Sequence, residues 1–153
     1  KNLLLLAKVE NRQFQDVQEL YLFEIVENSI TEIEDFITDK NIEIKAELSD
    51  NPKLKSNQAL AEILISNLLL NAVRYSESGG AVTVKSTNNK LIISNNGSQA
   101  LDKTALFDRF KKISSESKGS GLGLAIVNEI CNNNGWQIEY EFENNQHRFI
   151  LKF

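Results

Sequence analysis

Three residue types that often carry structural or catalytic chemistry are scarce here: the sequence holds one cysteine, one proline and one histidine among 153 residues. A single cysteine cannot form an internal disulfide, which fits a reducing compartment. Cys131 lies in an apolar helical pattern, so we expect a buried structural thiol and not a nucleophile. His147 lies in the last strand-like pattern, where we expect an ordinary, half-exposed strand residue.

Long apolar runs and an excess of basic residues are also lacking. No run approaches the length that crosses a bilayer, and residues 3–7 are too few for the apolar core of a signal peptide. The net charge of −4 argues against nucleic-acid binding, which requires a basic face. The remaining composition, 41% hydrophobic and 25% charged, is that of one ordinary globular domain. The chain starts without methionine in a helical pattern, so we expect a piece of a longer protein.

The order of the apolar patterns predicts the fold class. In the first half we expect a helix at 3–12, a strand or an approach to the next helix at 17–21, one amphipathic helix at 22–40 and a strand at 42–48. A loop at 49–57 ends in a helix N-cap and leads into a helix at 58–76. In the second half we expect a hairpin from strands 81–87 and 90–95, a helix at 121–133, and a hairpin from strands 136–143 and 147–153. Helices separated by antiparallel hairpins favour a two-layer sandwich with a mixed sheet.

The stretch from 58 to 76 predicts a buried helix, because it is mostly apolar and holds neither glycine nor proline. Asn67 and Asn71 interrupt it one helical turn apart, and Arg74 and Tyr75 follow one turn later. Residues at this spacing share a face of the helix. Burial of an amide without a partner is costly, so this polar stripe either binds a ligand or forms hydrogen-bonded pairs in the core.

Two polar, glycine-containing segments also need an explanation. Residues 96–120 lack a regular pattern but contain Phe107 and Phe110, which favours a lid that docks over a site. Residues 119–127 (GSGLGLAIV) place glycines at the start of a predicted helix, where free backbone N–H groups can meet anions. Alone, this pattern fits a phosphate cradle or a flexible hinge equally well. The spacing excludes a P-loop and a dinucleotide-binding GxGxxG motif.

Four motifs occur in the order NLLLNAVRYS, ISNNG, LFDRF and GSGLGLAIV. Together they resemble the N, G1, F and G2 boxes of sensor histidine kinases, which belong to the GHKL ATP-binding superfamily of gyrase, heat-shock chaperones, kinases and mismatch-repair ATPases. The resemblance covers about residues 20–153. It implies a Bergerat-type α/β (α+β) two-layer sandwich, whose mixed, mostly antiparallel sheet is covered by about three helices. It also implies that residues 1–13 end a helical dimerisation and phosphoacceptor domain, and that 14–153 form the catalytic domain that binds ATP.

The resemblance assigns roles to the polar stripe of the long helix. Asn71 resembles the amide that coordinates Mg²⁺, with Asn67 one turn back assisting at the metal or the phosphates. A carbonyl oxygen is a suitable hard ligand for Mg²⁺. Arg74 resembles the basic residue near the phosphates, and Tyr75 resembles the aromatic residue that lines the nucleotide pocket.

The F and G2 boxes imply further contacts with the phosphates. Phe107 and Phe110 match the F box, with Lys112 where many relatives carry a phosphate-facing arginine. The G2 box is matched by Gly119, Gly121, Leu122, Gly123 and Leu124, whose backbone N–H groups are expected at the phosphates.

The G1 box departs from the family pattern Asp-x-Gly-x-Gly. Asn95 stands where the family has the aspartate that accepts from the adenine amino group, Gly97 keeps the first glycine, and Gln99 replaces the second. The Asn95 amide oxygen can still accept a hydrogen bond, without the charge. We therefore expect adenine binding to persist.

One position separates a kinase from a hydrolase. Gyrase and chaperone relatives carry a water-activating glutamate four residues before the metal-binding asparagine, whereas this chain has Asn67, an amide without useful basicity. The resemblance therefore implies transfer of the γ-phosphoryl group of Mg–ATP to a histidine on the missing helical domain, and then to a response regulator. The alternatives are a serine kinase like the anti-sigma factors and a degenerate nucleotide-binding module without transfer. We expect a monomeric chain in the cytoplasm, from a sensor anchored in the bacterial inner membrane.

Overall fold

The computed structural model describes residues 2–108 and 121–153. In chain order the elements are α1 (Asn2–Glu10), β1 (Val17–Tyr21), α2 (Leu22–Glu32), α3 (Glu34–Asp39), β2 (Glu43–Glu47), β3 (Lys53–Asn57), α4 (Gln58–Arg74), β4 (Ala81–Ser86), β5 (Lys90–Asn96), the 3₁₀ turn η1 (Lys103–Ala105), α5 (Gly123–Asn134), β6 (Gln137–Glu143) and β7 (Gln146–Lys152).

The main sheet has five strands in the order β2-β4-β5-β7-β6. The pair β2–β4 is parallel, and the other three pairs are antiparallel. The hairpin β6–β7 turns at Asn144 and Asn145, which have φ of 53° and 57°. Asparagine tolerates this left-handed conformation better than most residues, so the turn forms where the sequence predicts it. The expected mixed, mostly antiparallel sheet is confirmed.

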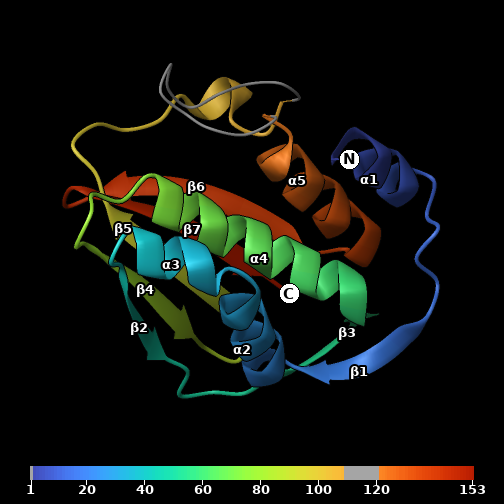
Figure 1. The fold of residues 1–153 in the computed structure, drawn as a ribbon. Helices are drawn as coiled ribbons and strands as arrows, with labels where there is room; N and C mark the ends of the chain where they lie inside the picture. The colour runs from blue at the N-terminus through green and yellow to red at the C-terminus, as the bar shows by residue number, and fades with distance from the viewer. Residues whose placement is uncertain (1, 109–120) are drawn as a thin grey trace.

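Helices α2, α4 and α5 lie across one face of this sheet, with α4 in the middle (Figure 1). The buried face of α4 is almost entirely aliphatic and fills the space between the sheet and the neighbouring helices. It consists of Leu60, Ala61, Leu64, Ile65, Ser66, Leu68, Leu69, Ala72 and Val73. The expected two-layer sandwich is therefore confirmed.

Two of the predicted elements differ in the structure. The helix expected at 22–40 is two helices, because the chain breaks at Ile33, which has φ −104° and ψ 15°. The apolar period continues across the break, since Ile33 is itself buried, and so the pattern does not reveal it. Part of the loop expected at 49–57 is strand β3, which pairs antiparallel with β1 in a separate two-stranded sheet. Only Leu54 and Ser56 of β3 are buried, which is too short an alternation to identify a strand.

Helix α1 packs against α5 and buries Leu6 and Val9. The Asn133 side chain of α5 donates to the Val9 carbonyl at 2.9 Å, which fixes the C-terminal part of α1. Cys131 on α5 is buried as expected, and burial raises the pKa of its thiol to about 12. Within the described part of the chain, no helix has the length and apolar character needed to cross a membrane.

Candidate functional site

Helix α4 carries the polar stripe to the edge of the sheet. It starts at Asn57, whose side-chain oxygen accepts from the Leu60 N–H at 3.1 Å, the arrangement of an N-cap. It ends at Tyr75, whose backbone N–H donates to the Asn71 carbonyl at 3.1 Å. The last turn of α4 places Asn71 and Tyr75 beside the start of β4 and the end of β5.

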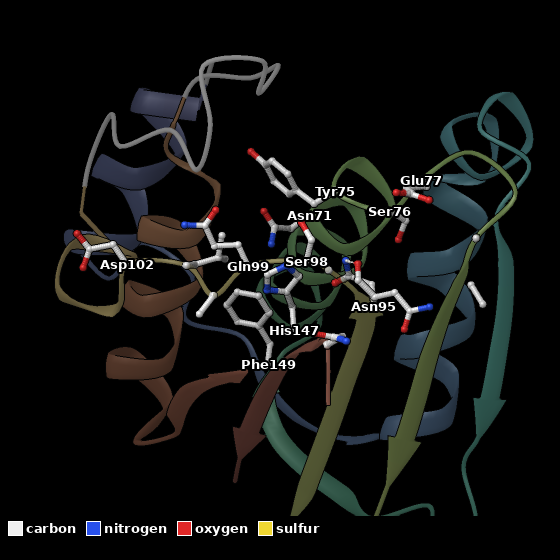
Figure 2. Close-up of a pocket in the computed structure, with 17 residues that line it drawn as sticks. Asn71, Tyr75, Ser76, Glu77, Asn95, Ser98, Gln99, Asp102, His147 and Phe149 are labelled. Atoms are coloured by element: carbon white, nitrogen blue, oxygen red, sulfur yellow. Dashed lines mark hydrogen bonds between the residues drawn. The ribbon is translucent and has the colours of Figure 1, made fainter. Parts of the chain in front are cut away.

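A cavity of about 1120 Å³ opens at this point, large enough for a nucleotide. Its walls are the last turn of α4 with residues 75–77, the start of β4, the end of β5, the start of β7 and residues 97–102, which we call the pocket loop. Figure 2 shows Asn71, Asn95 and His147 around this cavity. Of the residues with predicted contacts, Asn71, Tyr75, Asn95 and Gly97 line it.

The remaining predicted residues either lie away from the cavity or fall outside the described residues. Asn67, Arg74, Phe107, Gly121, Leu122, Gly123 and Leu124 do not line the cavity. Phe110, Lys112 and Gly119 lie outside the described residues. Among the described residues of the four motifs, only those of the N and G1 boxes line the cavity.

Asn67 on α4 lies beside the start of α5. Its side-chain nitrogen donates to the Ile63 carbonyl at 2.9 Å. A Cβ atom on Gly123 would lie 3.2 Å from its side-chain oxygen, tighter than ordinary contact, so the glycine lets the two helices approach closely here. Gly121, with φ of 74°, turns the chain into α5, and Leu122 is buried. The glycine-rich start of α5 thus lies next to the amide one turn before Asn71.

Arg74 is exposed and points toward α3. Its guanidinium carbon lies 5.7 Å from the centre of the Phe36 ring, a cation–π contact. The structure therefore does not bring Arg74 to the cavity. The physical reason is the position of Phe36, whose ring is 46% exposed and offers the guanidinium a surface. No lysine or arginine is among the described residues that line the cavity, whereas Glu77 and Asp102 are.

Asn95 is buried at the end of β5. Its side-chain nitrogen donates to the Asn96 carbonyl at 3.2 Å. In the antiparallel register it lies directly opposite His147 on β7. The next residue but one, Gly97, donates its backbone N–H to the Asn145 carbonyl at 2.8 Å. The G1 segment is therefore attached to the β6–β7 hairpin.

The expectation that His147 is half-exposed is wrong: it is 8% exposed and lines the cavity. Its Nδ1 lies 2.7 Å from the Tyr140 hydroxyl, and that hydroxyl accepts from the Leu101 N–H at 3.0 Å. Burial lowers the pKa of His147. Burial raises the pKa of Tyr140, and the hydrogen bond from Leu101 opposes this. The alternation of buried and exposed residues along the strand could have indicated this burial, because His147 lies on the same inward face of β7 as Phe149.

These features can be compared with known proteins. The sequence model of the family described as histidine kinase-, DNA gyrase B- and HSP90-like ATPase matches residues 56–153. The chain belongs to this family. The match starts just before α4 and continues to the end of β7, so the cavity described above lies within the ATPase domain of the family.

Relatives of this ATPase-family chain include sensor proteins. The heme sensor protein HssS of Staphylococcus aureus (strain JH9) is 35% identical over 135 residues, which cover 84% of this chain and 29% of HssS. The chain thus spans under a third of the length of that relative.

Solved structures show the same fold. The Acinetobacter baumannii histidine kinase AdeS superposes with a TM-score of 0.79 at 23% identity, covering 99% of this chain and 74% of AdeS. The histidine kinase ThkA, solved in complex with the response regulator TrrA, superposes with a TM-score of 0.72 at 20% identity, covering 99% of this chain and 46% of that one. The expected GHKL fold is confirmed.

Proposed function

We propose that this chain is the ATP-binding catalytic domain of a two-component sensor histidine kinase. It binds Mg–ATP and transfers the γ-phosphoryl group to a histidine on a helical domain outside this chain. The observation that carries the proposal is that Asn71 and Tyr75 line the same cavity as Asn95 and Gly97. Membership of the ATPase family and the likeness to HssS support it.

The residues of the cavity fit a nucleotide with a metal ion. Asn71 offers a neutral amide oxygen, a hard ligand of the type that Mg²⁺ takes beside water and phosphate oxygens. The metal would neutralise charge on the phosphates during transfer. Asn95 offers an amide oxygen to the amino group of adenine, and the Tyr75 ring offers an apolar surface beside it.

Asn67 favours transfer over hydrolysis. Hydrolysis requires a base that takes a proton from the attacking water, and an amide has no useful basicity. In the structure the Asn67 side chain donates to the Ile63 carbonyl, and its oxygen faces Gly123. From there, one helical turn before Asn71, it would assist at the metal or the phosphates. Phosphoryl transfer needs mainly positioning and charge neutralisation, which this arrangement allows.

The positive charge for the phosphates comes, in our proposal, from Arg74 and Lys112. Arg74 is one turn from Asn71, and rotation about its side-chain bonds would move its guanidinium from Phe36 toward the phosphates. Further phosphate contacts would come from Phe107, Phe110, Gly119, Gly121, Leu122, Gly123 and Leu124 of the F and G2 boxes.

The rest of the machinery would lie outside residues 14–153. We propose that residues 1–13 are the end of the helical phosphoacceptor domain, which forms the dimer in the full protein, while the chain alone is monomeric. A response regulator would receive the phosphoryl group, as the complex of ThkA with TrrA suggests by analogy. The full protein would be anchored in the bacterial inner membrane, with this domain in the cytoplasm.

The test is calorimetric titration of this chain with the ATP analogue AMPPNP, with and without Mg²⁺. We expect saturable binding, strengthened by Mg²⁺, and loss of the Mg²⁺-dependent part in Asn71→Ala. Asn132→Ala, an exposed amide on α5 away from the cavity, serves as the matched control. No saturable binding at millimolar nucleotide would refute the proposal.

A degenerate nucleotide-binding module is the second candidate, favoured by Asn95 and by Gln99, which lines the cavity in place of a second glycine. Phosphorylation assays with the upstream helical domain restored separate the candidates. Label that is stable to alkali and labile to acid identifies phosphohistidine and supports the kinase. Binding without transfer supports the module, and label on a serine of a partner protein supports the serine kinase.

A further inference from the structure

The pocket loop is held at two backbone positions by the β6–β7 hairpin. At its start the Gly97 N–H donates to the Asn145 carbonyl at 2.8 Å. Near its end the Leu101 N–H donates to the Tyr140 hydroxyl at 3.0 Å. The second attachment therefore depends on a side chain of the sheet and not on the backbone. Since the loop forms one wall of the cavity, the position of that hydroxyl affects the shape of the site.

The Tyr140 hydroxyl is fixed in turn by His147. Its oxygen lies 2.7 Å from Nδ1, and the two rings stack with centroids 5.9 Å apart and an angle of 28°. A hydroxyl has one hydrogen to donate, and Nδ1 is the acceptor that the described residues offer it, while the Leu101 N–H donates to the oxygen; the hydrogen therefore points to Nδ1. Nδ1 is then an acceptor, and the proton of the neutral imidazole resides on Nε2, a tautomer inferred from the hydrogen bonds.

The same imidazole supports the start of the loop. A Cβ atom built on Gly97 would lie 2.0 Å from Nε2 of His147 and 2.4 Å from Cδ2. The ring therefore occupies the space beneath Gly97 that any other residue would need. One side chain thus supports Gly97 by contact and Leu101 through Tyr140.

We propose that Tyr140 and His147 are positioning residues for nucleotide binding, which hold the pocket loop in its binding position only while the imidazole is neutral. The proposal rests on the proposed function, since the ligand is Mg–ATP. In the imidazolium form Nδ1 becomes a donor. The Tyr140 oxygen then receives two donors, from His147 and Leu101, and its own hydrogen loses its acceptor.

The surroundings of His147 disfavour the charged form. Tyr140 is the titratable side chain in contact with the ring, and the other described neighbours are uncharged: Phe142 on β6, Asn95 on β5 and Gly97 in the loop. The carboxylates that line the same cavity belong to Glu77 and Asp102. Glu141, Glu143 and Arg148 alternate with the inward residues, and Arg148 forms ion pairs with both glutamates on the opposite face of the sheet. Burial lowers the pKa of His147, in agreement with a neutral ring.

The first experiment measures the affinity of this chain for Mg–AMPPNP by calorimetry from pH 5.5 to 8. Tyr140→Phe keeps the stacked ring and removes the hydroxyl, so we expect binding at pH 8 to weaken by about 3- to 10-fold, the ratio for one lost hydrogen bond. Tyr21→Phe is the matched control, because Tyr21 is exposed on β1 and its loss of a hydroxyl should not change the affinity.

The pH profile tests the protonation step. Wild-type affinity should fall as the pH decreases below 6.5, whereas His147→Asn, which places an amide near the Nδ1 position and does not titrate, should show no such fall. Subtracting the His147→Asn profile from the wild-type profile cancels the effect that protonation of the nucleotide itself has on the affinity. If wild type does not bind at pH 8, the proposed function fails. If wild type binds, and Tyr140→Phe matches it at every pH, the positioning proposal fails alone.

A measurement on the unmodified protein avoids variants that do not fold. His147 is the only histidine, so the imidazole ¹⁵N signals belong to one residue. At pH 8 we expect the tautomer with its proton on Nε2. Saturating Mg–AMPPNP should lower the pH at which the ring titrates, because binding and protonation are reciprocally linked. An unchanged or raised titration midpoint, or the Nδ1–H tautomer, would overturn the proposal.

Discussion

Replacement of Gly97 with alanine should destabilise the protein through one identifiable collision. The new methyl carbon would lie 2.0 Å from Nε2 of His147. The imidazole ring is buried and hydrogen-bonded to Tyr140, so the ring cannot move away freely. Gly97 is not among the residues with positive φ, so backbone strain does not add to the cost. Forcing an extra methyl group into a packed site costs about 1–3 kcal/mol. The gain from restricting the unfolded chain, about 0.4–1 kcal/mol, offsets part of it.

The His147→Ser background separates the collision from every other effect of Gly97→Ala. Serine has no atom at the Nε2 position, so the methyl group should fit, and the substitution should become neutral or slightly stabilising. The coupling energy in this double-mutant cycle should equal the cost of the collision, about 1–3 kcal/mol. Urea denaturation of the four proteins measures it from the midpoints at constant m. A coupling energy below about 0.5 kcal/mol would refute the reasoning, because Gly97→Ala would then cost the same without the imidazole.

Four further predictions follow from single features. Asn57→Ala should lower the free energy of unfolding by about 1 kcal/mol in urea denaturation, because α4 loses its N-cap. Arg74→Ala should weaken the binding of ATP more than the binding of ADP in calorimetry. Equal losses of affinity for the two nucleotides would show that Arg74 does not contact the γ-phosphate. Cys131 should react with a thiol reagent only as fast as the chain opens, since its pKa is raised to about 12 by burial. The pKa of His147 is lowered in the folded state, so the unfolded chain takes up a proton first as the pH falls. The free energy of unfolding should therefore keep the whole contribution of the neutral ring above pH 6.5 and decrease as the pH falls below 6.5. The variant His147→Asn should not show this decrease between pH 6.5 and 5.5.

Much of the fold follows from local patterns in the sequence. The apolar stretch and the N-cap predict α4, which begins after Asn57 as expected. The asparagine pairs between apolar strands predict both hairpins, and Asn144 and Asn145 adopt the left-handed conformation that such a turn requires. The N and G1 boxes likewise predict the residues Asn71 and Asn95, which the structure brings to one cavity.

The missed features depend on information that a local pattern does not contain. The break at Ile33 leaves the apolar period intact, because the period reports side-chain direction and not backbone hydrogen bonding. Strand β3 is defined by its pairing with β1, far away in the sequence. The direction of Arg74 depends on Phe36 of another helix. The burial of His147 depends on the pocket loop that covers it.

One departure of the G1 box, Asn95, has a physical explanation in the neighbouring β6–β7 hairpin. Asn95 lies opposite His147 across β5 and β7, so a carboxylate at position 95 would stand beside the imidazole and favour its protonated form. A neutral amide at that position keeps the ring neutral, and a neutral ring can accept from Tyr140. Gly97 then has to be glycine, because the ring fills the space of its Cβ. The loss of the charge at Asn95 and the presence of His147 are therefore mutually consistent. Asn95→Asp should raise the pH at which the His147 ring titrates in ¹⁵N NMR, and an unchanged titration would contradict this argument.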